Sequence, residues 1–153
     1  MRCDVRVEGL DDLVDAIDKL GGEAACTRMR KNAGRKLAKR ARAEMKKHVP
    51  VSGDNARSGT RGNRTVHGHA RDNIPATVRT KDGDTYVDVG WRVSDNSEYF
   101  YMKFVEWGTH GTHPQPAKRF LEKTLDALGD VPGEIVKDEC ILTLKAAGID
   151  VEE

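Results

Sequence analysis

The chain of 153 residues has few aromatic side chains, no long apolar run and no motif of a common enzyme class. Its eight aromatic residues are two Trp, three Tyr and three Phe. No window approaches the run of about 18 apolar residues that a membrane-spanning helix needs, so we expect no membrane contact. No apolar run follows the N-terminal Met-Arg-Cys-Asp, so we also expect no signal peptide. Serine nucleophile elbows, Walker loops and dinucleotide fingerprints are absent, which argues against the enzymes that use them.

The cysteines are too widely spaced for a metal or redox motif. Cys3, Cys26 and Cys140 include no C-x-x-C pair. We predict that they are small buried hydrophobic residues in a reducing compartment, as is typical of a cytosolic protein.

The histidines form two close pairs, and neither pair has the surroundings of a metal site. His67 and His69 lie in one glycine-rich segment, and His110 and His113 lie in another. No cysteine or carboxylate stands at a recognised ligand spacing, so we predict neither a metal nor another cofactor. A nuclease that uses His67, His69 and Asn73 is the enzyme alternative, but the metal-binding turn of such a nuclease is missing. We therefore expect no enzymatic activity.

Glu106, next to Trp107, has the features of an isolated buried carboxylate. A catalytic acid or base is one interpretation of such a residue. We favour a structural role, in which Glu106 accepts hydrogen bonds from the tight turn at Gly108 and Thr109.

A net charge of +1 conceals a strong separation of charge along the chain. Residues 1–27 carry three basic and seven acidic side chains, residues 28–48 carry ten and one, and residues 120–153 carry three and nine. Such asymmetry indicates docking to a partner, to another copy of the chain or to nucleic acid. Solvated helix faces are the alternative.

The N-terminal third predicts a strand followed by two helices. Residues 2–8 alternate between apolar and charged side chains, as a half-buried strand does. Residues 10–20 have apolar side chains at helical spacing, and the Gly-Gly pair that follows should end this helix. A long helix is predicted over 23–47, and the next Val-Pro pair should stop it. Its apolar residues recur every four positions: Met29, Ala33, Leu37, Ala41 and Met45.

The apolar stripe of this long helix is narrow and rich in small residues, which indicates close packing against a thin or flat neighbour. Its other faces are basic. Lysine and arginine neutralise phosphates without reading sequence, so contact with nucleic acid is one interpretation. A solvated face, or one paired with an acidic neighbour, is the other.

Residues 51–73 contain four glycines and almost no apolar side chain, so they predict a long loop. Four arginines occur in it with no acid between them: Arg57, Arg61, Arg64 and Arg71. We interpret these arginines as candidate contacts to nucleic acid or to a partner. A segment that is disordered until assembly is the alternative.

The middle of the chain predicts a β-hairpin. Two alternating segments, 76–80 and 87–91, flank Asp82 and Gly83, a dipeptide that favours a two-residue hairpin turn. With the N-terminal strand, this hairpin would form a small antiparallel sheet with one solvated face.

Five of the eight aromatic residues lie within 99–107, and we expect this run to close the core. We favour a helix for 98–107, although the alternation also fits a strand. Two glycines then allow a sharp reversal, and a helix should open near Ala117. After a break at 129–133, a last helix is predicted over 133–147.

Together these elements predict a single α+β domain over residues 1–153. It would have a small antiparallel sheet packed against a long helix, with additional C-terminal helices. The long basic loop at 51–73 would lie within this domain.

Three motifs stand in the order found in one family of phage proteins. They are Val-Glu-Gly-Leu at 7–10, Val-Pro-Val-Ser-Gly at 49–53, and a signature segment after the hairpin. The signature residues are Tyr101, Val105, Glu106, Trp107, Gly108, Thr109, Pro116, Phe120 and Leu121. On these residues the chain resembles the tailed-phage family of tail-component, neck and head–tail joining proteins of the lambdoid siphophage type. It departs from the family at 117–119, which separates the proline from Phe-Leu, and in the length of the basic loop.

This resemblance implies a structural virion protein. It would form a homo-oligomeric ring in the neck or head-proximal tail, between the phage head-closure or connector protein and the tail terminator or tail-tube protein. Genomic DNA would pass through the ring without sequence-specific contacts, which suits the arginine loop. The protein would be made in the host bacterial cytoplasm and reside in the virion. A basic, sequence-independent nucleic-acid-binding module that forms no ring is the alternative function.

Overall fold

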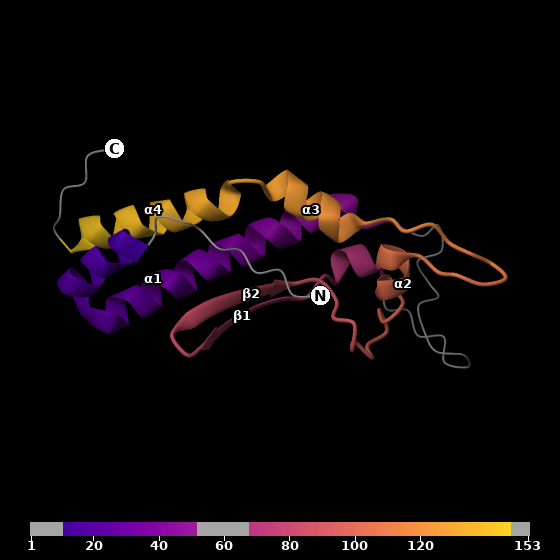
Figure 1. The fold of residues 1–153 in the computed structure, drawn as a ribbon, viewed down its shortest axis with the longest axis horizontal. Coiled ribbons are helices and arrows are strands. Elements are labelled where there is room, and N and C mark those ends of the chain that lie inside the picture. The colour runs from indigo at the N-terminus through magenta and orange to yellow at the C-terminus, as the bar shows by residue number, and fades with distance from the viewer. Residues whose placement is uncertain (1–10, 52–67, 148–153) are drawn as a thin grey trace. The chain divides into compact units, whose positions relative to one another are not determined.

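The computed structural model describes residues 11–51 and 68–147, except for the side chains of 11–13 and 15–20 (Figure 1). Its elements are the helices α1 (Asp11–His48), α2 (Met102–Trp107), α3 (Phe120–Leu128) and α4 (Val131–Ala146), the 3₁₀ turn η1 (Ala70–Asp72), and the strands β1 (Ala76–Lys81) and β2 (Asp84–Val89). The two strands form one two-stranded sheet. This combination of a hairpin sheet, one long helix and C-terminal helices confirms the predicted α+β class.

Several predictions fall outside the described residues. They include the strand at 2–8 and the part of the basic loop at 52–67 that contains Arg57, Arg61 and Arg64. The single domain over 1–153 stays a prediction. Within residues 11–51 and 68–147, no helix is long and apolar enough to span a membrane.

Helix α1 contains the break that the Gly-Gly pair predicts. Gly22 has φ 69° and ψ 174°, which is not helical, so two helical segments meet there at a kink. The second segment ends at His48, next to Val49 and Pro50, as predicted.

The hairpin forms with the predicted turn. Asp82 and Gly83 join β1 to β2 and have φ values of 55° and 86°. Positive φ at both turn residues is the type I′ pattern that matches the twist of the flanking strands. One detail differs, because β2 ends at Val89 and Trp91, expected on this strand, lies beyond its end.

The described residues divide into two compact units. The first contains residues 41–51, 68–76 and 89–128, and the second contains the remainder. The core of the first unit surrounds Trp91, whose ring centroid lies 6.2 Å from that of Tyr99 and 6.1 Å from that of Phe120. The buried members of this core are Met45, Val49, Ala70, Ile74, Trp91, Tyr99, Met102, Phe120 and Leu121.

In the second unit, the small residues of α1 allow close packing, as predicted. A Cβ added to Gly34 would lie 3.0 Å from Val78 and 3.1 Å from Thr85, so the helix backbone meets the hairpin directly. The apolar core of this unit joins α1 to α4 through Cys26, Met29, Cys140 and Leu144. The prediction of buried cysteines is therefore confirmed for Cys26 and Cys140, and Cys3 lies outside the described residues.

Two helix boundaries differ from the predictions. Helix α3 begins at Phe120 and not near Ala117, because Arg119 has a left-handed φ of 47° that a helix cannot contain. Helix α4 begins at Val131, so the break predicted over 129–133 is only two residues long. Pro132, within that predicted break, lies in the first turn of α4, where a helix needs no N–H from proline.

Candidate assembly surface

The aromatic run forms a turn and then a helix, and its side chains point to two opposite sides. α2 confirms the helix favoured for this segment and excludes the strand. Tyr99, Met102 and Glu106 are buried. The exposed fraction of the side chains is 39% for Phe100, 44% for Phe104 and 59% for Trp107. The prediction that the whole run closes the core is therefore wrong for three of its five aromatic residues.

The helical period explains this division. Positions 99, 102 and 106 recur at spacings of three and four residues and share one face, while 100, 104 and 107 share the other. Since both faces carry aromatic side chains, apolarity alone could not tell which face is inside. The predicted burial of Glu106 already pointed to the inner face, because a buried, bonded carboxylate has its partner within the fold, but that prediction was not used to choose between the two faces.

The exposed face is a small apolar surface, which we call the aromatic patch: Phe100, Phe104 and Trp107. The rings of Phe100 and Phe104 meet edge to face, with centroids 6.5 Å apart and planes at 89°. The Lys103 ammonium lies 5.3 Å from the centroid of the Phe104 ring, within range of a cation–π contact. Exposed aromatic side chains that share one helix face are typical of sites of protein association.

Glu106 holds the start of α3 in place. It is only 3% exposed, and its Oε2 accepts a hydrogen bond of 3.1 Å from the N–H of Leu121. Leu121 is the second residue of α3, whose N–H has no partner inside the helix. Glu106 therefore caps α3 from α2, and a carboxylate there also matches the helix dipole. The predicted burial is confirmed, but the predicted partner, the turn at Gly108 and Thr109, is wrong.

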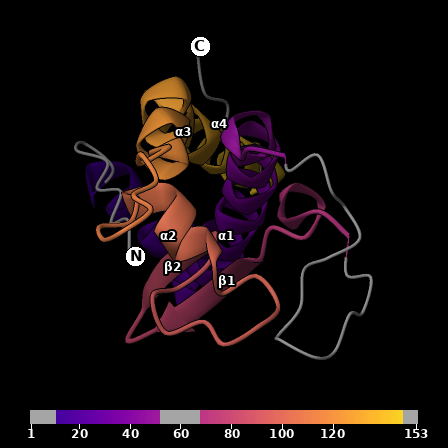
Figure 2. The same cartoon turned by 90° about the vertical axis from the view of Figure 1, so that its right-hand side faces the viewer.

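The chain reverses after α2 through a tightly packed base. Thr109 and Gln115 pair, with Thr109 N–H donating to the Gln115 carbonyl and Gln115 N–H donating to Thr109 Oγ1, each at 3.0 Å. Gly108 has φ 77°, and a Cβ there would lie 2.6 Å from the Gln115 carbonyl oxygen. Glycine is thus required by backbone angle and by space. Figures 1 and 2 show the loop beyond this base leading out from α2 and back to α3.

The remaining signature residues support this arrangement. Tyr101 and Val105 are half-buried and pack against the first core, and Phe120 and Leu121 are buried in it. Burial, and secondarily the nearby Tyr99, raises the pKa of the Tyr101 hydroxyl. Pro116 is exposed.

The loop histidines do not form a metal site in the described part of the chain. His110 and His113 are exposed on the reversal, His69 is half-buried beside η1, and His67 lies outside the described residues. No group of three potential ligands occurs among the described His, Cys, Asp and Glu side chains.

Of the four loop arginines, only Arg71 lies in the described chain. It belongs to η1 and is half-buried, and its Nε is buried without a hydrogen-bond partner. The neighbouring Asp72 pairs with Lys46 at 2.7 Å, and this hydrogen bond lowers the pKa of the Asp72 carboxyl. Arg71 therefore lies in η1 at the end of the loop, beside Asp72 in sequence, which pairs with Lys46 of α1.

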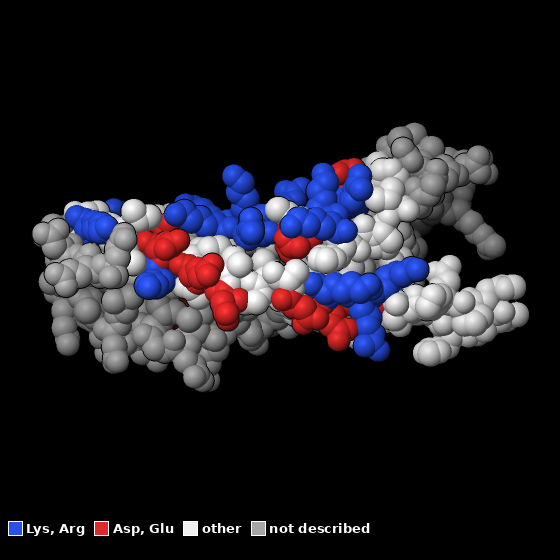
Figure 3. Space-filling model, turned by 90° about the horizontal axis from the view of Figure 1, so that it is seen from above, with Lys and Arg blue, Asp and Glu red and all other residues white. Residues whose placement is uncertain are grey.

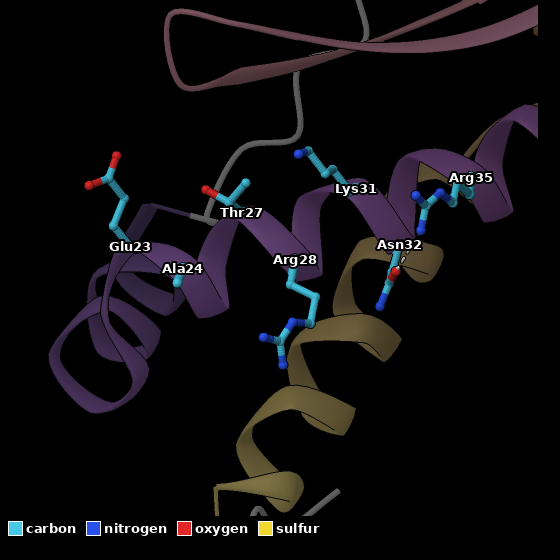
Figure 4. Close-up of a pocket in the computed structure, with 7 residues that line it drawn as sticks. All are labelled: Glu23, Ala24, Thr27, Arg28, Lys31, Asn32 and Arg35. Atoms are coloured by element: carbon cyan, nitrogen blue, oxygen red, sulfur yellow. Dashed lines mark hydrogen bonds between the residues drawn. The ribbon is translucent and has the colours of Figure 1, made fainter.

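The basic residues of α1 are partly paired, as one interpretation predicted. Lys36 forms an ion pair with the buried Glu139 of α4, and Arg30 donates a hydrogen bond of 3.1 Å to the Gly83 carbonyl. Others point to solvent, and Figure 3 shows blue Lys and Arg side chains beside red Asp and Glu side chains on one face. A shallow hollow occurs on α1, lined by Glu23, Ala24, Thr27, Arg28, Lys31, Asn32 and Arg35 (Figure 4).

The sequence model of the family described as "Bacteriophage HK97-gp10, putative tail-component" matches residues 11–108. The chain belongs to this HK97-gp10-like family. No curated protein and no solved structure matches the chain. Membership agrees with the resemblance to tailed-phage tail and neck components and implies a structural protein of the phage particle that contacts other phage structural proteins.

The HK97-gp10-like match covers α1, the hairpin and α2, and it ends at Gly108. It therefore includes the aromatic patch and Glu106. The Thr109–Gln115 base, Pro116 and the Phe120-Leu121 start of α3 follow the matched region.

Proposed function

We propose that this tail component forms a homo-oligomeric ring in the neck or at the head-proximal end of the tail, where it joins head to tail around the DNA channel. The ring would act as a structural element and catalyse no reaction. Its other partners would be the head-closure or connector protein and the tail terminator or tail-tube protein. The observation that carries this proposal, beside family membership, is the aromatic patch.

The aromatic patch has the composition of an interface core. Phe and Trp are enriched where protein surfaces become buried on association, and Trp is frequent among the residues whose truncation weakens binding most. Trp107 is 59% exposed in a chain that has only two tryptophans. The residues beneath the patch are fixed by the Glu106–Leu121 bond, so the patch is presented by a rigid support.

The distribution of charge also supports contacts between copies. Residues 28–48 carry ten basic and one acidic side chain, whereas residues 120–153 carry three and nine. Beyond the Lys36–Glu139 pair within the chain, opposite charges on different segments would attract neighbouring copies and favour a closed, head-to-tail ring. The arginine loop, with Arg57, Arg61, Arg64 and Arg71, would contact the passing DNA or a neighbouring virion protein.

The patch is tested by a double variant, Phe104→Ser with Trp107→Ser. The matched control is Val93→Ser with Leu125→Ser, since these two apolar side chains are also exposed and lie in the same unit. Both variants should keep the circular dichroism spectrum of the unaltered chain. We expect rings, or tail-associated copies in electron micrographs, with the unaltered chain and the control but not with the patch variant. Rings formed equally well by the patch variant would contradict the proposal.

The arginine loop is tested in a phage whose own copy of the gene is replaced. The variant replaces four arginines with Glu: Arg57, Arg61, Arg64 and Arg71. It should reduce the number of infectious particles or the retention of DNA, while the isolated protein stays folded. Normal titres would refute the role of the loop. The alternative function, a nucleic-acid-binding module without assembly, is favoured by the basic surface of α1. It predicts a DNA-binding monomer and no rings under any condition.

A further inference from the structure

Four basic residues form a row of exposed side chains along α1. Arg28, Lys31, Arg35 and Lys39 are all exposed and follow one another at spacings of three, four and four residues. At 3.6 residues per turn, these positions fall within about 80° of the helix circumference. At about 1.5 Å per residue they extend over about 16 Å. We call this row the α1 basic stripe.

Between residues 28 and 39 of α1, the two basic side chains outside the stripe bond to other parts of the fold, whereas those of the stripe form no such bond within the described chain. Lys36 pairs with Glu139, and Arg30 bonds to the Gly83 carbonyl. Within residues 11–51 and 68–147, Arg28, Lys31 and Lys39 have no ion pair, and Arg35 bonds only the Asn32 amide, at 3.5 Å. The stripe therefore presents positive charge that the described chain leaves uncompensated.

The hollow on α1 lies along this stripe. In Figure 4, Lys31 extends toward the side of the hairpin and Arg28 toward the side of α4, and the small side chains of Ala24 and Thr27 lie nearer Glu23. Hydroxyl and amide groups such as those of Thr27 and Asn32 are common donors to phosphate oxygens. One acid, Glu23, lies at the N-terminal end of the hollow.

The composition of the stripe favours nucleic acid over a protein partner. The hollow has no large apolar or aromatic side chain, whereas protein interfaces have a buried core rich in such residues. Lys and Arg contact phosphates strongly but carry no sequence information by that contact. Since the phosphates of one strand rise by about 3.4 Å each along the duplex axis, a stripe of about 16 Å parallel to that axis covers the rise of about five of them.

We propose that the α1 basic stripe binds the phosphate backbone of duplex DNA without reading its sequence. This site is separate from the arginine loop and has a rigid helical support. The inference rests on the proposed function only in that the ring would bring DNA to this site. The binding of DNA by the isolated protein does not depend on the ring.

The experiment compares two triple variants of the full chain that carry the same net charge. Arg28→Gln, Lys31→Gln and Lys39→Gln remove three charges of the stripe and keep good helix formers. Lys118→Gln, Lys123→Gln and Lys137→Gln remove three exposed charges elsewhere. Fluorescence anisotropy with two duplexes of unrelated sequence measures affinity across a salt series, and electron microscopy of the same samples records ring formation separately.

Counterion release sets the expected result. Four phosphate contacts give a salt slope of about −3.6, so a fourfold rise in salt lowers the affinity of the unaltered chain about 150-fold. With one contact left, the same rise lowers the affinity only about 3.5-fold. We expect the stripe variant to bind more weakly with this shallow slope, the control to keep the steep slope, and both duplexes to bind alike.

Three outcomes would overturn the inference. They are no DNA binding by the unaltered chain, equal losses in the two variants, and a stripe variant that binds DNA normally but fails to assemble. The last outcome would assign the stripe to a protein contact. Absence of rings alongside the expected DNA binding would refute the proposed ring and leave the stripe standing.

Discussion

The hydrogen bond between Glu106 and Leu121 makes a sharp prediction about stability. Glu106→Ala removes the acceptor and leaves the N–H of Leu121, at the buried start of α3, without a partner. A bond to a charged group contributes about 1.5–3 kcal/mol, and an unpaired buried donor costs a similar amount. We expect the free energy of unfolding to fall by about 2–3 kcal/mol. Glu106→Gln keeps an acceptor of the same shape and loses only the charge, so we expect a fall of about 1 kcal/mol.

The control is Glu122, another glutamate next to the start of α3. Its side chain is exposed and pairs with Arg119 at 3.4 Å on the surface. Such pairs contribute little, so Glu122→Ala should change stability by less than about 0.5 kcal/mol. Urea unfolding followed by circular dichroism measures all three variants, and thermal midpoints should fall by about 2–4 °C per kcal/mol. If Glu106→Ala were no less stable than Glu122→Ala, the capping role would be refuted.

Two further predictions follow from burial. Trp91→Ala should lower the free energy of unfolding by about 3–5 kcal/mol, as truncations of large core side chains do. Trp107→Ala should lower it by less than about 1 kcal/mol, because Trp107 is 59% exposed. Equal losses for the two variants in urea unfolding would show that the exposure is misassigned. Burial, and secondarily Glu139, raises the pKa of the Cys140 thiol. The unfolded chain therefore loses this proton first, and stability should be full below the unfolded thiol pKa of about 8.5 and fall as the pH rises above it. Unfolding measured on both sides of that pH should show a smaller fall in Cys140→Ala, and an identical fall would exclude this cause.

The elements that the sequence predicts well are those with local causes. The type I′ turn follows from the two residues Asp82 and Gly83, and the end of α1 follows from Val49 and Pro50. The apolar stripe of α1 is set by the helical period, and its residues Met29, Ala33, Ala41 and Met45 are buried. In each case the chemistry that determines the structure lies within one turn of the chain.

The features that sequence analysis missed depend on contacts between distant residues. Glu106 and Leu121 are 15 positions apart, and no local rule connects a helix end with an acceptor on another helix. Lys36 and Glu139 are separated by most of the chain, so only the fold shows which basic residues of α1 are neutralised. The positive φ of Arg119, which arginine does not favour, delays the start of α3 to Phe120.

The two tryptophans show why composition overestimated the core of this chain. Trp91 is 9% exposed and contacts two aromatic rings, while Trp107, with similar apolar area, is 59% exposed. A sequence records the total apolar surface that must be buried, but not whether the burial occurs on folding or on assembly. A subunit of a virion buries apolar surface first when it folds and again when it assembles, and both kinds of burial favour the same residue types. The run at 99–107 therefore contains one face that the fold buries, held by Glu106, and one that awaits a partner in the proposed ring.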